Sequence, residues 1–449
     1  MLVAHPRVVV TDPVPGKRHN EPIRFTVDAE LHGDLWTART STGEDMLCQR
    51  IETGSNGTTF VAVLSFKDTV ELELTGPTAE PVKGISQLPA RESDAFVRLD
   101  TGYFDLEMCR GTAQGTGSSK WGLRHFSTLD EGIDLLPSGN NAIGGFYGPF
   151  FTPENGLVNP PEHTTVDIEV VEQGPVLHHY RMHGVVPDGQ LDELKGKSFT
   201  IDWWFSHGTP YFERRYQIDD FQTVINGRSI TNKITVGDEF EGGRGELVFD
   251  RFEAYGGTRY RTGDPYAGEL VAMVGETLAE STSTQPKYAE FRELLAGDLE
   301  AAHWDLYWRL FSAWENALTP DEIRDRLGRV RAASHVLADL PTRPWSLANA
   351  PVDVSSAPHA TIFPGAAAKT AEFHSRLGRA MVWWTSQPSG AFQIVQRRQS
   401  GWVNWGTNGE NECPELPVGV TIKAAYGPFG ALWHEIADQL ETPPTVHVS

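Results

Sequence analysis

The residues best suited to chemistry begin in a stretch, 111–165, that is rich in glycine, aromatic residues and asparagine and lacks the alternation of its neighbours. Lys120, Trp121, Arg124 and His125 stand close together within it. A sugar site needs an aromatic ring for the apolar sugar face and forked donors for hydroxyls or a carboxylate. Because binding residues commonly lie on loops held by a rigid scaffold, we predict an ordered loop that binds a hydroxyl-rich ligand. The alternative is a packed tryptophan beside a surface ion pair.

A second group lies in the strand predicted over 176–185, where alternation places His179, Arg181 and His183 on one face. Arg215, two predicted strands later, can join the same polar face. An arginine beside a uronate carboxylate stabilises charge as the α-proton leaves, and a histidine or tyrosine takes that proton. This pattern favours β-elimination on an acidic sugar, and the alternative is a solvated sheet face.

These patterns lead to two sets of predicted site residues. The predicted catalytic residues are His125, His179, His183, Tyr147 and Arg215. The predicted substrate-binding residues are Lys120, Trp121, Arg124, Asn141, Arg181, Arg228, Asn232 and Trp405. Trp405 lies in a segment that also carries Glu410 and Glu412, and two carboxylates at a fixed separation are what glycoside hydrolysis requires. The sequence has no nucleophile elbow, phosphate loop or dinucleotide-binding fingerprint.

No cofactor is predicted. A divalent metal is the less favoured alternative, because His163, which follows Pro160 and Pro161, would need further ligands such as His125 or His179. The plainer interpretation of this proline pair is a rigid turn.

The composition limits the classes of binding partner that can be expected for this protein. The net charge is -22 at pH 7, and affinity for nucleic acid or anionic membranes comes largely from lysine and arginine, so neither is predicted as a partner. A small-molecule or oligosaccharide substrate is expected instead, and a homo-oligomer is left open. The 3 cysteines are far apart and predict neither a zinc site nor a disulfide framework. We see no signal peptide and no apolar run near the ~20 residues of a membrane span, so a cytoplasmic location is expected.

The elements around these residues predict a mainly β protein. Alternation in 1–76 and a proline-rich strap after it predict a small N-terminal β domain with a linker, together spanning 1–92. Repeatedly reversing strands after that predict one large antiparallel β-sandwich over 93–449, with a helical insertion. Helical spacing is confined to 286–340 and 430–441.

The layout resembles the β regions of carbohydrate-active enzymes. The run Arg18-His19-Asn20-Glu21-Pro22 entering a strand, and Cys48-Gln49 after a turn, look like the small barrel domains of exo-acting rhamnogalacturonan lyases and the post-catalytic β domains of α-mannosidases. The run from Leu99 to Leu106 looks like the opening strand of a galactose-mutarotase-like supersandwich. The resemblance covers about 8–248, carries no catalytic motif, and implies a carbohydrate ligand.

The sequence thus predicts a carbohydrate-active enzyme that cleaves an oligosaccharide or glycoside, by β-elimination on an acidic sugar. A glycoside hydrolase with paired carboxylates is the first alternative. A non-catalytic carbohydrate-binding protein and a mutarotase-like epimerase are the others.

Overall fold

The fold is known from a computed structural model of the 449-residue chain. The described residues are 6–14, 16–54, 57–79, 83–111, 120–136, 143–147, 165–186, 195–225, 228–230, 233–241, 251–256, 352–353, 360–364, 367–374, 377–387, 391–397, 402–406, 416–429 and 433–449.

The first domain is a 7-stranded antiparallel sheet whose order is β2-β5-β4-β3-β6-β1-β28. Its strands are β1 (Arg7–Thr11), β2 (Lys17–Val27), β3 (Leu35–Thr40), β4 (Asp45–Gly54), β5 (Gly57–Lys67), β6 (Thr69–Pro77) and β28 (Thr445–Val448). Alternating residues such as Ile23, Phe25 and Val27 fill its core. The last strand of the chain pairs with the first, since Val8 lies opposite Val448. Residues 445–448 therefore belong to the first domain, whereas the sequence pattern predicts them in the second.

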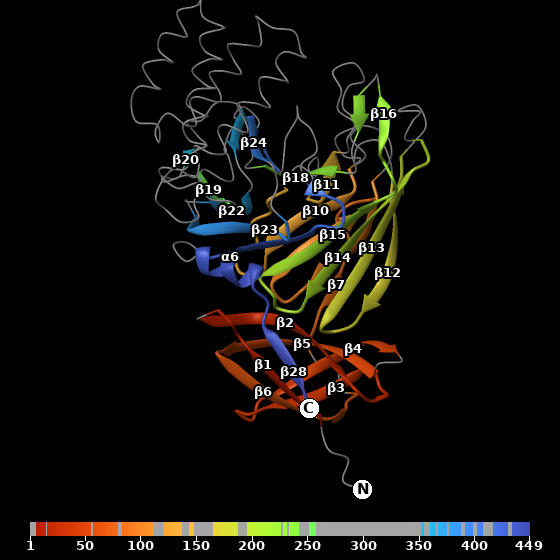
Figure 1. The fold of residues 1–449 in the computed structure, drawn as a ribbon, viewed down its shortest axis with the longest axis vertical. Coiled ribbons are helices and arrows are strands. Elements are labelled where there is room, and N and C mark those ends of the chain that lie inside the picture. Colours follow the sequence, from red (N-terminus) through yellow and green to blue (C-terminus); the bar gives the residue numbers. More distant parts are fainter. Residues whose placement is uncertain are drawn as a thin grey trace, which may run out of the picture.

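The second domain is built from antiparallel sheets in layers (Figure 1). The largest has nine strands in the order β12-β13-β14-β15-β27-β23-β22-β19-β20. These are β12 (Asp167–Gln173), β13 (Leu177–Val185), β14 (Ser198–Ser206), β15 (Tyr211–Ile218), β27 (Thr421–Gly427), β23 (Arg379–Thr385), β22 (Ala367–His374), β19 (Arg251–Gly256) and β20 (Val352–Asp353).

Three smaller sheets complete this domain. A four-stranded sheet contains β7 (Ser86–Leu88), β8 (Ala95–Asp100), β9 (Phe104–Cys109) and β10 (Gly122–Thr128). A six-stranded sheet contains β11 (Gly145–Tyr147), β18 (Lys233–Glu241), β25 (Trp402–Gly406), β24 (Ala391–Arg397), β21 (Ala360–Pro364) and β26 (Leu416–Pro417). The strands β16 (Thr223–Ile225) and β17 (Arg228–Ile230) form a hairpin. The predicted mainly β, antiparallel class is therefore confirmed.

One face of the nine-stranded sheet packs inward on a large apolar core, which includes Tyr180, Trp203 and Phe212. The opposite face, which we call the outer face, meets the first domain and the helix α6 (Trp433–Glu441). Trp433 and Leu440 of α6 pack on Tyr211 and Val382 there, which confirms the helix predicted over 430–441. The helices predicted in 286–340 lie outside the described residues. In the described part of the chain, no helix is long and apolar enough to cross a membrane.

The two domains are joined by polar contacts as well as by apolar packing. The Gln49 side chain of the first domain accepts the backbone N–H of Val176 at 3.0 Å and that of Leu177 at 2.9 Å. Val61 and Trp204 belong to the apolar cluster around this contact. The junction is therefore a specific interface that fixes the first domain against the outer face.

The stretch 111–165 is not a single loop, contrary to the prediction. It contains β10, whose seven residues are all buried, and the short strand β11. Strand β10 was not predicted from the sequence, because a strand that is buried on both faces shows no alternation of apolar and polar residues.

Candidate functional site

The outer face carries a row of polar side chains drawn from neighbouring strands. Register places Arg181 of β13 opposite Asp202 of β14, and Asp202 opposite Arg215 of β15. Two residues away on each of these strands, and therefore on the same face, His179 lies opposite Trp204, and Trp204 lies opposite Glu213. The alternation of these strands therefore brings together three predicted residues, His179, Arg181 and Arg215, with Asp202 and Trp204, which the prediction missed.

Contacts within this row are short. His179 Nε2 lies 2.7 Å from Asp202 Oδ1, and Arg181 Nε donates to the same oxygen at 2.9 Å. Burial raises the pKa of the Asp202 carboxyl, but the hydrogen bond from His179 and the charge of Arg181 outweigh it, so the net pKa is lowered. The His179 ring stacks on Trp204 with centroids 4.7 Å apart. Asp202 thus orients His179 and leaves Nδ1 of the ring for other partners.

Two predicted residues lie at the margins of the row. The Arg215 guanidinium lies 5.8 Å from the Trp204 ring, and its Nε donates to Thr421 Oγ1 at 3.2 Å. His183 is exposed on the same face of β13. On the reverse face, His178 and Tyr180 are buried, and burial lowers the pKa of His178 to about 4.

A cavity of about 350 Å³ adjoins this row, between the first domain and the outer face. It is lined by Glu21, Pro22, Ile23, Arg24, Val61, Leu177, Trp204, Ser206, Tyr211, Phe212, Glu213, Lys423, Pro443, Pro444 and Val446. Its volume falls within the range of small-molecule sites, and it combines apolar walls with a few convergent polar groups. Trp204 connects the cavity to the polar row, because its side chain lines the cavity and also stacks on His179, which belongs to the row.

Two carboxyl groups face this cavity from different domains. Glu21, on β2, is 5% exposed, and Glu213, on β15, has a side chain that is 29% exposed. Lys423 of β27 lies beside both: its Nζ is 3.6 Å from Glu213 Oε1, and its charge acts on Glu21. The Lys423 Nζ also donates to the backbone oxygen of Leu440 at 3.0 Å, which holds the amine in place.

The Glu21 carboxyl is predisposed to hold a proton. Burial raises its pKa, and this effect exceeds the opposing influence of Arg18, Lys423 and a hydrogen bond with Tyr211. Arg18 is the strongest of the opposing influences: its Nη1 lies 3.3 Å from Glu21 Oε1, although Asp12 also binds it, with Nε–Oδ2 at 2.7 Å and Nη2–Oδ1 at 2.9 Å. Glu21 is therefore a carboxyl group of raised pKa in a cavity with a second carboxyl group, an arrangement typical of acid–base sites.

The first predicted group does not form a surface. Trp121 is 0% exposed and stacks on Phe199 at 5.5 Å, so its ring is a core side chain and the prediction that it binds a sugar is wrong. Arg124 is also buried and binds Asp94 through Nη1 at 2.7 Å. Lys120 is 7% exposed. These residues lie on or beside β10, where the sheets cover them.

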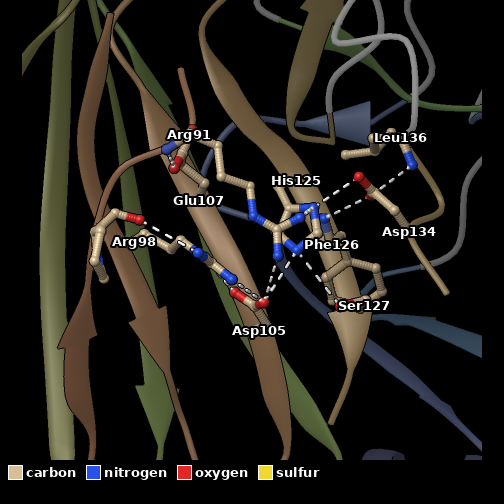
Figure 2. Close-up of polar contacts among 10 residues, drawn as sticks. Arg91, Arg98, Asp105, Glu107, His125, Phe126, Ser127, Asp134 and Leu136 are labelled. Atoms are coloured by element: carbon tan, nitrogen blue, oxygen red, sulfur yellow. Dashed lines mark hydrogen bonds and ion pairs between the residues drawn. The ribbon is translucent and has the colours of Figure 1, made fainter. Parts of the chain in front are cut away.

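His125 lies in a charged network on β8, β9 and β10 (Figure 2). Its Nδ1 is 2.7 Å from Asp134 Oδ2, and its Nε2 is 3.4 Å from Asp105 Oδ2. Arg91 Nη1 also lies 2.9 Å from Nδ1, but that nitrogen cannot donate to Asp134 and accept from Arg91 at once. We infer that His125 Nδ1 carries the proton and donates it in a hydrogen bond to Asp134, because the Arg91 guanidinium is already bound by Asp105 at 2.8 Å.

The two carboxylates beside His125 favour its protonated form. Burial lowers its pKa, but the hydrogen bonds to Asp105 and Asp134 outweigh this, so the net pKa is raised. The ring is 3% exposed and lies between two carboxylates. This position lends no support to a role of His125 as catalytic base, which stays a prediction.

Replacing His125 by Gln tests this network. Because the folded-state pKa of His125 is raised, its contribution is fully present below the unfolded pKa and is lost as pH rises through the folded pKa. We expect the variant to lose about 1–3 kcal/mol of unfolding free energy at pH 6, and the difference from wild type to shrink toward pH 9. Urea denaturation at several pH values measures this, with exposed His183→Gln as the matched control. A difference independent of pH would contradict the imidazolium assignment.

The structure leaves the other predicted residues without an assigned contact. Tyr147 lies in β11, Arg228 in β17 and Trp405 in β25, but their side chains are not among those described. Asn141, Asn232, His163, Glu410 and Glu412 lie outside the described residues. Within the described chain, no group of three His, Cys, Asp or Glu residues could hold a metal ion.

Comparisons with known proteins leave the family open. No protein-family model and no curated protein matches the sequence. An α-mannosidase structure from Enterococcus faecalis matches with a TM-score of 0.47 and 10% identity, over 99% of this chain and 46% of its own. A glycosyl hydrolase family 38 protein from the same organism matches with a TM-score of 0.45 and 8% identity, over 99% of this chain and 47% of its own.

An aldose 1-epimerase-like structure from Klebsiella pneumoniae matches with a TM-score of 0.35 and 9% identity, over 94% of this chain and 96% of its own. The chain spans about half the length of the two Enterococcus structures. These names belong to the classes that the sequence resembles. At such TM-scores and identities, the likeness carries no argument about activity.

Proposed function

We propose that this protein is a carbohydrate-processing enzyme whose active site is the cavity between the first domain and the outer face. The observation that carries this proposal is the pair Glu21 and Glu213, two carboxyl groups on the wall of one cavity, of which Glu21 has a raised pKa. Glycoside hydrolysis uses such a pair, one group as acid and the other as base or nucleophile. Glu21 would protonate the leaving oxygen, and Glu213 would act on the opposite side as the carboxylate.

The other lining residues suit an acidic saccharide. The half-buried Trp204 offers an indole face, on which the apolar side of a sugar ring packs well. Arg24 lines the cavity, and the Arg215 guanidinium lies over the Trp204 ring, so cationic groups gather here on a chain of net charge -22. Such groups would bind a sugar carboxylate, because arginine forms paired hydrogen bonds with that group.

Elimination is the second candidate, and the pair His179 and Asp202 favours it. Asp202 holds His179 Nε2 at 2.7 Å, and Arg181 shares the same carboxylate. In this scheme His179 Nδ1 takes the α-proton of a uronate, and Arg215 stabilises the charge that develops on its carboxylate. The α–β double bond then forms as the bond from the β-carbon to the glycosidic oxygen breaks, and the leaving oxygen takes a proton from water. Hydrolysis takes precedence because the cavity walls carry two carboxyl groups, of which Glu21 is buried and has a raised pKa.

A product assay separates the candidates. The protein would be incubated with uronate-containing oligosaccharides and with their neutral counterparts, while the ultraviolet absorbance of an unsaturated uronate and the number of reducing ends are followed. New reducing ends without absorbance would support hydrolysis, and both signals together would support elimination. Binding without either product on every saccharide would overturn the enzymatic proposal in favour of a carbohydrate-binding protein.

A further inference from the structure

A further cavity of about 550 Å³ lies at the junction of the two domains, and its volume also falls within the range of small-molecule sites. The first domain lines it with β4 and the start of β3, and the second domain with the end of β12 and the turn that leads to β13. Gln49 lines this cavity and donates to the backbone oxygen of Leu177, which lines the cavity of Glu21, at 3.1 Å. The two cavities, which we call the Glu172 cavity and the Glu21 cavity, therefore adjoin the same contact between the domains.

Glu172 of β12 is fixed in the wall of the Glu172 cavity through one of its two oxygens. Gln49 Nε2 donates to Glu172 Oε1 at 2.8 Å. A Cβ at Gly174 would lie 2.3 Å from Gln49 Cδ, so glycine is needed where the two domains approach so closely. Among the described residues, no side chain bonds to Glu172 Oε2. That oxygen can therefore accept a hydrogen bond from a ligand in the cavity.

The charges in the Glu172 cavity disfavour an acidic ligand. Asp34, Glu52 and Glu172 line the cavity together with Arg50, and Arg50 forms an ion pair with Asp34. Burial raises the pKa of Glu172 against the opposing hydrogen bond from Gln49, and the charge of Asp34 raises it further. A uronate would meet these carboxyl groups and a guanidinium that is already paired. Uncharged hydroxyl groups, which donate as well as accept, suit the same acceptors.

A row of side chains across neighbouring strands connects the two cavities. Register places Glu172 of β12 opposite His179 of β13. His179 in turn lies opposite Trp204 of β14, which lines the Glu21 cavity. Neighbouring strands lie about 4.8 Å apart, so two strand spacings, roughly 10 Å, separate Glu172 from Trp204. Because His179 and Trp204 are both partly exposed, a short oligosaccharide can lie along this row and reach both cavities, whereas a single sugar ring cannot.

We propose that the Glu172 cavity is a second saccharide subsite, which binds an uncharged sugar unit of an oligosaccharide whose acidic unit occupies the Glu21 cavity. This inference rests on the proposed function, which places the acidic unit beside Arg24 and Trp204. Glu172 Oε2 accepts a hydroxyl hydrogen of the uncharged unit, and the apolar side chain of Leu35 provides a wall for its ring. The substrate class is therefore an oligosaccharide of mixed charge, rather than a free uronate or a chain of uronates.

Titration calorimetry of the full chain tests this inference, with Glu21→Gln as the background so that no product forms. The probe is glucuronate linked to a chain of neutral xylose units, and the comparisons are glucuronate alone and an oligogalacturonate of equal length. We expect the mixed-charge probe to bind at least about tenfold more tightly than either comparison, because two linked subsites then act together. Adding Glu172→Ala should remove most of that gain and leave the affinity for glucuronate unchanged.

Two controls separate a lost subsite from a damaged junction. Gln49 keeps its hydrogen bond to Leu177 when Glu172 is replaced, so the near-ultraviolet circular dichroism should not change. Asp167→Ala, which removes an exposed acid of β12 outside the cavity, should bind all three saccharides as the background does.

The outcomes distinguish this inference from the proposed function. Equal affinities for the mixed-charge probe and glucuronate, a loss of glucuronate affinity in the Glu172→Ala protein, or no binding of any of the three saccharides would overturn the second subsite, even if the product assay showed cleavage. A gain in affinity that depends on Glu172, on a protein that forms no product, would support the second subsite and count against the enzymatic proposal alone.

Discussion

Replacing Glu21 by Gln is expected to lower kcat on the cleaved saccharide by about 10²–10⁴-fold, the usual contribution of a general acid or base. The amide has nearly the same shape but cannot donate a proton to the leaving oxygen. Substrate contacts with Trp204 and Arg24 are kept, so KM should change little. Steady-state kinetics on the saccharide that yields product provides the measurement.

The pH profile of this variant gives a second check. Wild-type activity needs protonated Glu21, so kcat should fall as pH rises through the raised pKa of that carboxyl. The residual activity of Glu21→Gln should lack this alkaline limb. Glu71→Gln, an exposed change on β6 of the same domain, is the matched control and should behave as wild type. Full turnover in Glu21→Gln would place the chemistry elsewhere.

Replacing Arg214 by Met is expected to destabilise the protein by about 3–5 kcal/mol, because it leaves the carboxylate of Asp238 buried without its ion-pair partner. Urea denaturation followed by tryptophan fluorescence would measure the loss, since Trp203 and Trp383 flank the guanidinium. The double variant Arg214→Met with Asp238→Leu should recover part of it, because no buried charge is then left unpaired.

An exposed ion pair in the same protein supplies the control for this experiment. Arg39 Nε binds Asp45 at 2.7 Å, and their side chains are 58% and 52% exposed. Arg39→Met should destabilise the protein far less than Arg214→Met, because water screens the exposed pair and solvates the remaining carboxylate. Equal losses in the two arginine variants would show that burial does not govern the energy of the Arg214 pair.

The first domain illustrates where prediction from sequence stops. Its alternating strands are visible in the sequence, but Glu21 is not among the predicted site residues, because an acid in a strand is usually solvated. It becomes a candidate acid only because segments distant in the sequence bury it beside the cavity, and that burial raises its pKa. The returning strand β28 escapes prediction for a related reason: pairing between the two ends of a chain leaves no local signal.

The sequence by itself determined the mainly β class, the C-terminal helix, and the face on which His179 and Arg181 lie, because periodicities of two and 3.6 record which side of an element meets water. Tertiary structure alone decided that Trp121 and His125 are buried and that Glu21 meets Glu213. Burial and long-range proximity depend on how sheets stack, and residue types in one segment do not encode what a distant segment will cover.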